Sequence, residues 1–533
     1  MANLRKPNLS LGFGSAKVNA LAMASGTLVS RLTGLLRLLA LAYALGIGTF
    51  SDSFNLANNT PNIIYDLLLG GIISASILPV FVGHFAKDDE GSAWDSISSV
   101  FSIGLVLLVV GTAVFELAAP AIIHLYLIVN HTQIAAQQQR VATLLLRYFA
   151  PQLLFYGLIA LLTAILNARS VFAPPAYAPV VNNIVAIFVF LMFSIAKKSL
   201  DLGSVHAFSV PILLLGVGTS AGVALQFLFL LPSLKKAGAR IRFQPDYRNP
   251  AIHEIWAISG WTIGFVIANQ VALFWILAIA ASSTPGTVSA YTYGYIFFQL
   301  PYGIASYSIM AAIMPELARS FSQGQLERYK KRLGMALRSS VTIMFPAAFA
   351  YLAISRPVLT LLLGHGAVNP NGVGLTTRAL NGFAVGLPGF AGYLAVVQAY
   401  QSIKRTRIVF VLYLLENGLN IILAVTLHLR YGTYGLAISL SIAYSVAFLA
   451  GLATLVRNQL APNLSAMLRP WINSLAASVA MYAALRILIS RIGIATGLHL
   501  LFEVILEVIL GAIVFAVVTL IGTQIDSLTD RSH

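Results

Sequence analysis

Long apolar runs, separated by short polar segments, follow one another along the whole chain. A helix needs about 20 apolar residues to cross a bilayer, and about fourteen runs reach that length. The pattern therefore predicts an all-α polytopic membrane protein with about 14 transmembrane helices. The predicted spans are 17–46, 53–84, 94–126, 140–168, 176–197, 206–233, 252–282, 287–320, 328–364, 373–402, 406–429, 433–457, 466–490 and 496–523.

Composition agrees with this class and argues against an enzyme. The 533 residues are 58% apolar and 9% charged, and no cysteine is present to form a disulfide, a thiol nucleophile or a Cys-based metal site. The sequence contains no P-loop and no H-E-x-x-H or G-x-S-x-G motif, and its nine histidines lack ligand spacing. We therefore expect no catalysis, no cofactor and no metal other than Na⁺. The expected coupling ion is Na⁺ or H⁺.

The net charge of +16 is distributed as a topology signal. Lys and Arg concentrate in alternate loops, which places both termini in the cytoplasm and agrees with an even number of spans. The polar start leads directly into the first span, which we expect to be retained. The basic excess predicts attraction to anionic membrane lipids rather than nucleic acid. The basic loop residues are Arg5, Lys6, Lys17, Arg169, Lys235, Lys236, Arg240, Arg242, Arg248, Arg328, Lys330, Lys331, Arg332, Lys404, Arg405, Arg407 and Arg457.

Residues recur at a nearly constant offset, which indicates an internal duplication. The offset is 237 residues for three pairs, and a Leu-Pro/Met-Pro pair, Pro79 with Pro315, repeats at 236. Six spans fit into that offset, so the two lobes have the same orientation, as in parallel-repeat transporters. The pairs at 237 are Pro151 with Pro388, Tyr156 with Tyr393, and Asn183 with Asn420.

The duplication predicts the domain organisation. We expect an N-terminal lobe at 1–234 (spans one to six), a cytoplasmic linker at 235–249, a C-terminal lobe at 250–460 (spans seven to twelve), and spans thirteen and fourteen with a tail at 461–533. Two lobes around a central cavity are a common transporter layout, in which alternating access comes from rocking of the lobes.

Two arginines, Arg31 and Arg37, lie inside the first predicted span. Each costs roughly 2.5–3.5 kcal/mol near the centre of a membrane helix, so both are expected to face a protein-lined cavity and to meet an anion. The alternative is that they lie near an interface and extend to water. A diphosphate suits the planar guanidinium, which donates two hydrogen bonds to one phosphate.

Further polar residues accompany the arginines. Asp52 either orients an arginine or caps the second span. Asn62, beside Pro61, either contacts sugars or satisfies backbone groups freed by the proline, as do Asn58 and Asn59.

A second polar cluster interrupts the eleventh span. Glu416 and Asn420 are four residues apart and share a helix face with Asn417 nearby. Asn269 and Gln270 in the seventh span are their expected partners. Such oxygen ligands suit Na⁺ or a proton-carrying carboxyl group, and the alternative is hydrogen bonding that only holds helices together.

The N-terminal segment resembles a known family signature. The matching elements are Ser30-Arg31-Leu32-Thr33-Gly34-Leu35-Leu36-Arg37, Asp52-Ser53-Phe54-Asn55, Pro61-Asn62, Gly70-Gly71-Ile72-Ile73-Ser74, Leu78-Pro79 and the Leu-Pro-Tyr-Gly element at 300–303. They are similar to the MurJ (MviN) family of lipid II flippases, within the multidrug/oligosaccharidyl-lipid/polysaccharide exporter superfamily. The resemblance extends along essentially the whole chain.

The resemblance implies a flippase that moves lipid II, an undecaprenyl-diphosphate-linked glycopeptide, across the bacterial cytoplasmic membrane for peptidoglycan synthesis and cell shape. It implies that Arg31 and Arg37 hold the diphosphate, and we add Ser30, Asp52 and Asn62 to the predicted substrate-binding residues. It implies a V-shaped cavity, a groove for the lipid tail along the last two helices, and in some members a sodium site on spans seven and eleven. We expect a monomer, with cell-wall synthesis machinery as a further partner.

The chain departs from the family pattern at two cavity positions. Many members carry arginines where this chain has Tyr65 and Ile296. Fewer cations for a diphosphate favour, as an alternative substrate, another undecaprenyl-linked glycan. Paired arginines argue against a cation-coupled drug exporter, and short tails argue against a non-transporting scaffold.

Overall fold

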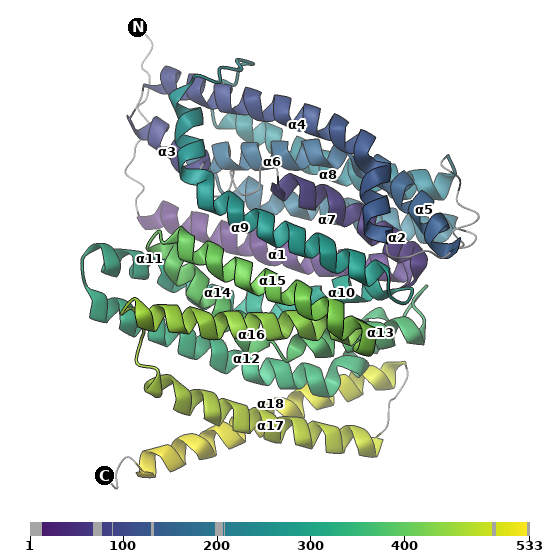
Figure 1. The fold of residues 1–533 in the computed structure, drawn as a ribbon, viewed down its shortest axis with the longest axis vertical. Helices are drawn as coiled ribbons and strands as arrows, with labels where there is room; N and C mark the ends of the chain where they lie inside the picture. Colours follow the sequence, from purple (N-terminus) through teal and green to yellow (C-terminus); the bar gives the residue numbers. More distant parts are fainter. Residues whose placement is uncertain are drawn as a thin grey trace. The chain divides into compact units, whose positions relative to one another are not determined.

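The computed structural model describes residues 13–67, 77–87, 89–128, 133–197, 206, 208–492 and 497–529. Almost all of them are helical, and none of them lies in a β-strand, as the apolar pattern predicts (Figure 1). The helices are α1 (Phe13–Leu45), α2 (Thr49–Tyr65), α3 (Leu78–Lys87), α4 (Glu90–Leu127), α5 (Gln133–Phe149), α6 (Pro151–Ala168), α7 (Ala173–Ala196), α8 (Val210–Lys236), α9 (Pro250–Ala281), α10 (Thr287–Pro301), the π-helix η4 (Tyr302–Ser306), α11 (Tyr307–Ser322), α12 (Leu326–Leu363), α13 (Pro370–Ala384), α14 (Leu387–Ser402), α15 (Thr406–Tyr431), α16 (Thr433–Arg457), α17 (Ser465–Ile492) and α18 (Leu498–Thr529).

Membrane-crossing helices dominate the described part of the chain. Twelve of them are long and apolar enough to span a bilayer, and α13 with α14, bent by 53° at a short break, makes a thirteenth. These thirteen correspond to every predicted span except the second. The described parts of the second span are α2 and α3, and residues 68–76 between them lie outside the described residues. The prediction of a polytopic helical membrane protein is therefore confirmed.

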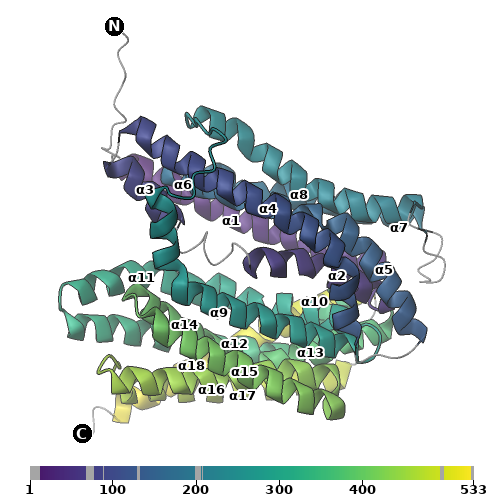
Figure 2. The same cartoon turned by 45° about the horizontal axis from the view of Figure 1, so that its top comes forward.

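The first compact unit comprises Met1–Ala44, Ala57–Ile123 and Arg140–Ile263. Within it, α7 packs alongside α8, which in turn contacts α6 (Figure 2). Part of its core is formed by α3, α4 and α6, where Phe81, Trp94 and Leu161 are almost fully buried. These are apolar faces of helices that the sequence pattern already marks as membrane spans.

The linker was predicted at 235–249, but Lys235 and Lys236 form the end of α8. The remaining segment, 237–249, runs along α4. The amide of Arg242 donates to Ser98 Oγ at 3.1 Å, and the amide of Gln244 donates to Ser102 Oγ at 2.8 Å. Arg169, after α6, donates from Nε to the carbonyl of Ala237 at 3.3 Å. Three side chains therefore fix the backbone of a segment that forms no helix of its own.

The second compact unit comprises Leu45–Leu56, His124–Gln139 and Gly264–His533. The last two helices, α17 and α18, pack against each other and against α12 (Figure 1). Their shared core contains Ala353 and Ile354 of α12 with Met481 and Leu485 of α17. The helix pair that the sequence places outside the repeat is thus anchored to this unit through α12.

Residues that suggested a duplication lie on helices in the same order in both halves of the chain. Pro151 begins α6 directly after α5 ends, and Pro388 lies at the start of α14 directly after α13 ends. Asn183 lies on the next helix of one set, α7, and Asn420 on the next helix of the other, α15. Proline tolerates the first turn of a helix because its missing N–H has no intrahelical acceptor there. Superposition of the two lobes, with these domain boundaries, stays a prediction.

Candidate substrate-binding and ion-binding sites

Asn183 of α7 holds the middle of α1 in place. Its side-chain amide donates to the carbonyl of Ser30 at 3.2 Å and to Thr33 Oγ1 at 3.0 Å. Asn183 is buried, and it lies beside Gly34 of α1, where an added Cβ would make an ordinary contact 3.7 Å from Asn183 Nδ2. The bond fixes the rotation of the helix that carries both arginines. Sequence reasoning identified Asn183 only as a repeated residue, not as a positioning residue.

Arg37 lies among aromatic and polar groups of two other helices of the first unit, α2 and α6. Its guanidinium interacts electrostatically with the hydroxyl of Tyr156 on α6. The hydroxyl of Tyr156 also interacts with Asn62 of α2 and donates to Gln152 Oε1 at 3.2 Å. The ring of Tyr65 lies 6.2 Å from that of Tyr156. Arg37 and Asn62, both predicted from sequence, therefore belong to one cluster, which also contains Tyr65.

Arg31 lies on a different side of α1 from Arg37. Six residues advance an α-helix by about 600°, which separates the two side chains by about 120° around the axis. Arg31 is exposed and Arg37 is half-buried. Arg31 forms no hydrogen bond or ion pair with any residue that the structure describes, and its neighbour Ser30 engages Asn183 through its carbonyl. Of the predicted substrate residues, the structure thus brings Asn62 to the Tyr156 cluster beside Arg37 and leaves Arg31 available.

Asp52 is engaged by the start of α10. Its Oδ2 accepts from the amide of Gly286 at 2.7 Å, and its Oδ1 accepts from the amide and hydroxyl of Ser289 at 2.8 and 2.7 Å. Asn55 adds a bond from Nδ2 to Ser289 Oγ at 3.0 Å. The proposed capping of the second span is therefore wrong in detail: Asp52 is the fourth residue of α2, and the helix it caps is α10. Its predicted contact with an arginine or with substrate has no counterpart in these bonds.

Replacing Asp52 by Asn is expected to destabilise the protein. The buried carboxylate accepts three charge-assisted bonds, and an amide turns N–H groups toward backbone N–H donors, so we expect a loss of about 2–3 kcal/mol. Thermal unfolding in detergent, measured with Asp89→Asn as control, tests this. Asp89 is exposed and accepts one bond, from the amide of Ser92 at 3.2 Å, so its substitution should cost less than about 1 kcal/mol. Equal melting temperatures for the two variants would refute the assigned role.

Glu416 is a buried carboxyl group in an aromatic enclosure of the second unit. Its side chain is 2% exposed, and five tyrosine hydroxyls interact with it electrostatically. No lysine, arginine or histidine among the described residues forms an ion pair with it. A charged carboxylate at such a place needs a cation or a proton to balance it. The tyrosines are Tyr291 and Tyr295 of α10, Tyr393 of α14, Tyr413 of α15 and Tyr444 of α16.

The asparagines beside Glu416 are buried and have partners. Asn420 Oδ1 accepts from Ser439 Oγ of α16 at 3.0 Å, and Asn417 Nδ2 donates to the carbonyl of Tyr413 at 2.9 Å. On α9, Gln270 is buried and Asn269 is exposed. All three α15 residues are therefore buried, while a shared ion site and a partnership with Asn269 and Gln270 stay predictions.

The α9 and α15 helices pack directly against each other one to two turns before these residues. The rings of Phe265 and Tyr413 stack with centroids 5.0 Å apart, and a Cβ on Gly264 would lie 3.0 Å from the ring of Phe410. The contact supports the expectation that α9 contributes to the site. The tyrosine enclosure was missed from sequence because its five members come from four helices and share no spacing. Among the described residues, no group of three His, Cys, Asp or Glu side chains comes together as a metal site.

Comparison with known sequences gives the same family throughout. The profile of the family described as "Lipid II flippase MurJ" matches residues 41–522. The "Probable lipid II flippase MurJ" of Vibrio cholerae is 26% identical over 422 residues, covering 78% of this chain and 78% of the relative. The protein of the same description from Bdellovibrio bacteriovorus is 26% identical over 474 residues, covering 88% and 87%.

Solved structures show the same fold. A structure titled "Lipid II flippase MurJ, inward closed conformation" matches with a TM-score of 0.76 at 19% identity, covering 94% of this chain and 98% of that one. An inward-facing multidrug resistance MATE family transporter of the MOP superfamily matches with a TM-score of 0.64 at 14% identity, covering 82% and 95%. The family consists of transporters, not enzymes. The family profile spans most of the chain, and we conclude that this protein belongs to the MurJ family of lipid II flippases.

Proposed function

We propose that this chain moves lipid II from the inner to the outer leaflet of the bacterial cytoplasmic membrane by alternating access, with both termini in the cytoplasm. The observation that carries the proposal is the pair of arginines within α1, together with membership of the family. Arg31 is available, and Arg37 lies beside Tyr156, whose hydroxyl is a hydrogen-bonding group for a phosphate or sugar oxygen. Substrate binding at these arginines is our assignment.

The headgroup chemistry follows from the groups around Arg37. A guanidinium donates two parallel hydrogen bonds to a phosphate, and such bonds are strong where water is scarce. The family resemblance implies an arginine at the position of Tyr65 in many members, and here the ring of Tyr65 lies 6.2 Å from that of Tyr156. We propose that aromatic and hydroxyl groups take over part of the headgroup contacts in this chain.

The chain path supports rocking of two bodies. The start of α2, within Leu45–Leu56, belongs to the second compact unit, while the residues before and after it belong to the first. The polypeptide therefore passes between the units at Ala44/Leu45 and again at Leu56/Ala57. We propose that the junction at Ala44/Leu45 is a hinge, because it lies at the end of α1 and hinge motion concentrates in a few residues at the ends of elements.

Coupling is assigned to Glu416. A ligand shifts a two-state equilibrium only if its affinity differs between the states, so the bound Na⁺ or H⁺ must favour one arrangement of the transporter. Asn417 and Asn420 supply further oxygen atoms within one helical turn of the carboxyl group. The absence of an ion-pair partner for Glu416 among the described residues supports a mobile cation or proton as its counter-charge.

Complementation tests the substrate. We expect the chain to restore growth and cell shape to a bacterium depleted of its own lipid II flippase. Failed rescue by well-expressed, membrane-inserted protein would contradict lipid II as substrate and would favour another undecaprenyl-linked glycan, the second candidate that the uncharged Tyr65 and Ile296 raise. Rescue that is insensitive to Arg37→Ala would contradict the assigned site.

A further inference from the structure

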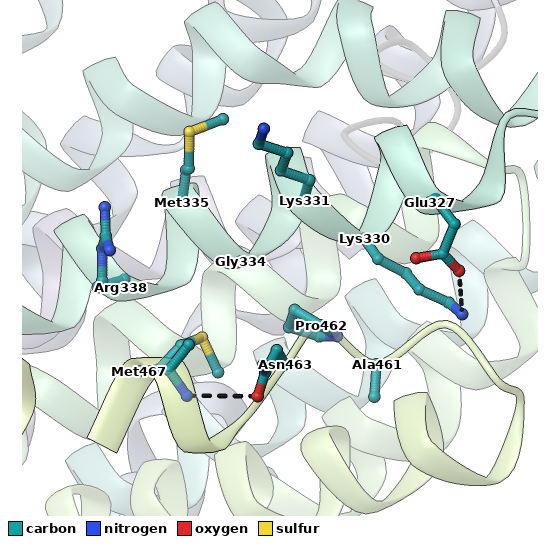
Figure 3. Close-up of a pocket in the computed structure, with 11 residues that line it drawn as sticks. Glu327, Lys330, Lys331, Gly334, Met335, Arg338, Ala461, Pro462, Asn463 and Met467 are labelled. Carbon is teal, nitrogen blue, oxygen red and sulfur yellow. Dashed lines mark hydrogen bonds and ion pairs between the residues drawn. The ribbon is translucent and has the colours of Figure 1, made fainter. Parts of the chain in front are cut away.

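A cavity of about 570 Å³ lies between the first half of α12 and the segment that leads from α16 into α17 (Figure 3). It belongs wholly to the second unit and is separate in sequence from α1 and from the Glu416 site. Its volume falls in the range of small-molecule sites. The lining residues are Glu327, Lys330, Lys331, Gly334, Met335, Arg338, Ala461, Pro462, Asn463, Ala466 and Met467.

The cavity carries an excess of positive charge. Lys330 Nζ pairs with Glu327 Oε1 at 2.9 Å, so these two charges compensate each other. Lys331 and Arg338 are exposed, and neither forms an ion pair with an acidic residue in the described part of the chain. Figure 3 shows both side chains rising from the same stretch of α12, on either side of Met335. Two unneutralised cations therefore line one hollow.

The walls of the cavity are built by fixed contacts. Pro462 is buried against Gly334, where an added Cβ would lie 3.0 Å from the proline Cβ. Asn463 Oδ1 accepts from the amide of Ala466 at 3.3 Å, which fixes the turn into α17. Trp471 Nε1 donates to the carbonyl of Arg338 at 3.4 Å, which joins α17 to α12 beside the cavity. The hollow is a product of packed helices rather than of a loose loop.

The order of residues along α17 indicates that the cavity lies near the level of lipid headgroups. Exposed apolar side chains begin on α17 immediately after the lining residues, at Leu468 and then Ile472. Tryptophan is enriched at the boundary between hydrocarbon and headgroups, and Trp471 stands at this transition. A molecule with a phosphate in the cavity and acyl chains along Leu468 and Ile472 would match both the basic lining and the apolar surface of α17.

We propose that this cavity binds the phosphate of an anionic phospholipid of the surrounding membrane, with Lys331 and Arg338 as the phosphate ligands. Free inorganic phosphate offers Lys331 and Arg338 the same anionic oxygen atoms as the lipid phosphate. The apolar surface beginning at Leu468 favours the lipid, because free phosphate gains nothing from it. The bound headgroup would connect α12 to α17, the helix pair outside the repeat.

Quenching of Trp471 by brominated lipid tests the site. The full-length chain in detergent is titrated with phosphatidylglycerol bearing brominated acyl chains, and the signal of Trp471 is isolated by subtracting the Trp471→Phe variant. We expect brominated phosphatidylcholine to quench more weakly. Each basic side chain near an anionic headgroup contributes about a fivefold change in affinity. The half-saturating lipid concentration of Lys331→Gln/Arg338→Gln should therefore rise at least about tenfold.

A charge-matched control separates the site from general attraction. Arg328→Gln/Arg407→Gln removes the same charge from exposed residues that do not line the cavity, and should change half-saturation less than about twofold. Displacement of the lipid by millimolar inorganic phosphate, lost in Lys331→Gln/Arg338→Gln, would identify free phosphate as the ligand and would overturn the assignment to a lipid. Equal quenching by both lipids, unchanged in Lys331→Gln/Arg338→Gln, would overturn the proposal.

Discussion

Replacing Arg31 and Arg37 together by Ala is expected to abolish lipid II transport. A hydrogen bond to a charged group contributes about 2 kcal/mol, so one substitution should slow transport about thirtyfold and both about a thousandfold. Lysine at either position should restore only a minor part, because an ammonium lacks the planar fork. Transport of fluorescent lipid II in proteoliposomes, normalised to reconstituted protein, measures the effect.

A matched arginine outside the proposed site provides the control. Arg430 is exposed at the end of α15, where its guanidinium lies 5.6 Å from the ring centre of Tyr431, and Arg430→Ala should leave transport within about twofold of the wild type. Arg31 and Arg37 also differ in surroundings, since only Arg37 contacts the Tyr156 cluster. Adding Tyr156→Phe to Arg31→Ala should therefore lower the transport rate further. Adding it to Arg37→Ala should leave the rate unchanged. Full transport by the double Ala variant would eliminate diphosphate binding by α1.

Glu416→Gln is expected to remove the ion dependence of transport and to lower its rate at least about tenfold, the effect of losing an ion-linked preference of roughly 1.4 kcal/mol. The amide keeps the shape of the side chain but neither holds a cation electrostatically nor releases a proton. Transport is measured against sodium at fixed pH and against pH at fixed sodium. If sodium concentration changes the wild-type rate but not the variant rate, the coupling ion is Na⁺. If pH does so, the coupling ion is H⁺.

Helix packing alone would give a different result. If Glu416 only joins helices, Gln should cost on the order of 1 kcal/mol in stability and preserve the ion dependence. Glu116, on α4 of the first unit, pairs loosely with Arg147 at 3.9 Å and serves as the control carboxyl group. Glu116→Gln should leave ion dependence intact. The same ion dependence in Glu416→Gln as in the wild type would rule out coupling at this residue.

The fold was predictable because each span is a local property of the sequence. Apolar length alone located thirteen of the predicted spans, and the repeated prolines Pro151 and Pro388 fall at the same kind of helix break. The three polar residues of α15 were predicted together for the same reason, since Glu416, Asn417 and Asn420 share one helical turn and need no tertiary information. Asn183 lies on α7 and Asn420 on α15, and the correspondence of these helices in the two lobes stays a prediction.

Features made by distant segments were not predictable from spacing. Asp52 bonds to Gly286 and Ser289, more than 230 residues away, and one acidic residue near a helix start gives no sign of which helix it caps. The tyrosines around Glu416 and the bond of Asn183 to α1 depend in the same way on tertiary packing. Arg31 and Arg37 were identified correctly as residues of one helix, but their separation of about 120° follows only when helical geometry is applied to their spacing.

Flipping by reconstituted protein directly tests whether this chain moves lipid II between leaflets. The purified full-length chain is incorporated into liposomes that contain lipid II labelled on its headgroup, and a membrane-impermeant quencher reports the fraction in the outer leaflet over time. We expect the wild type to exchange lipid II between leaflets much faster than protein-free liposomes, and Arg31→Ala/Arg37→Ala to match the protein-free rate. A folded wild-type protein that exchanges lipid II no faster than empty liposomes, under every sodium and pH gradient applied, would contradict lipid II transport by this chain.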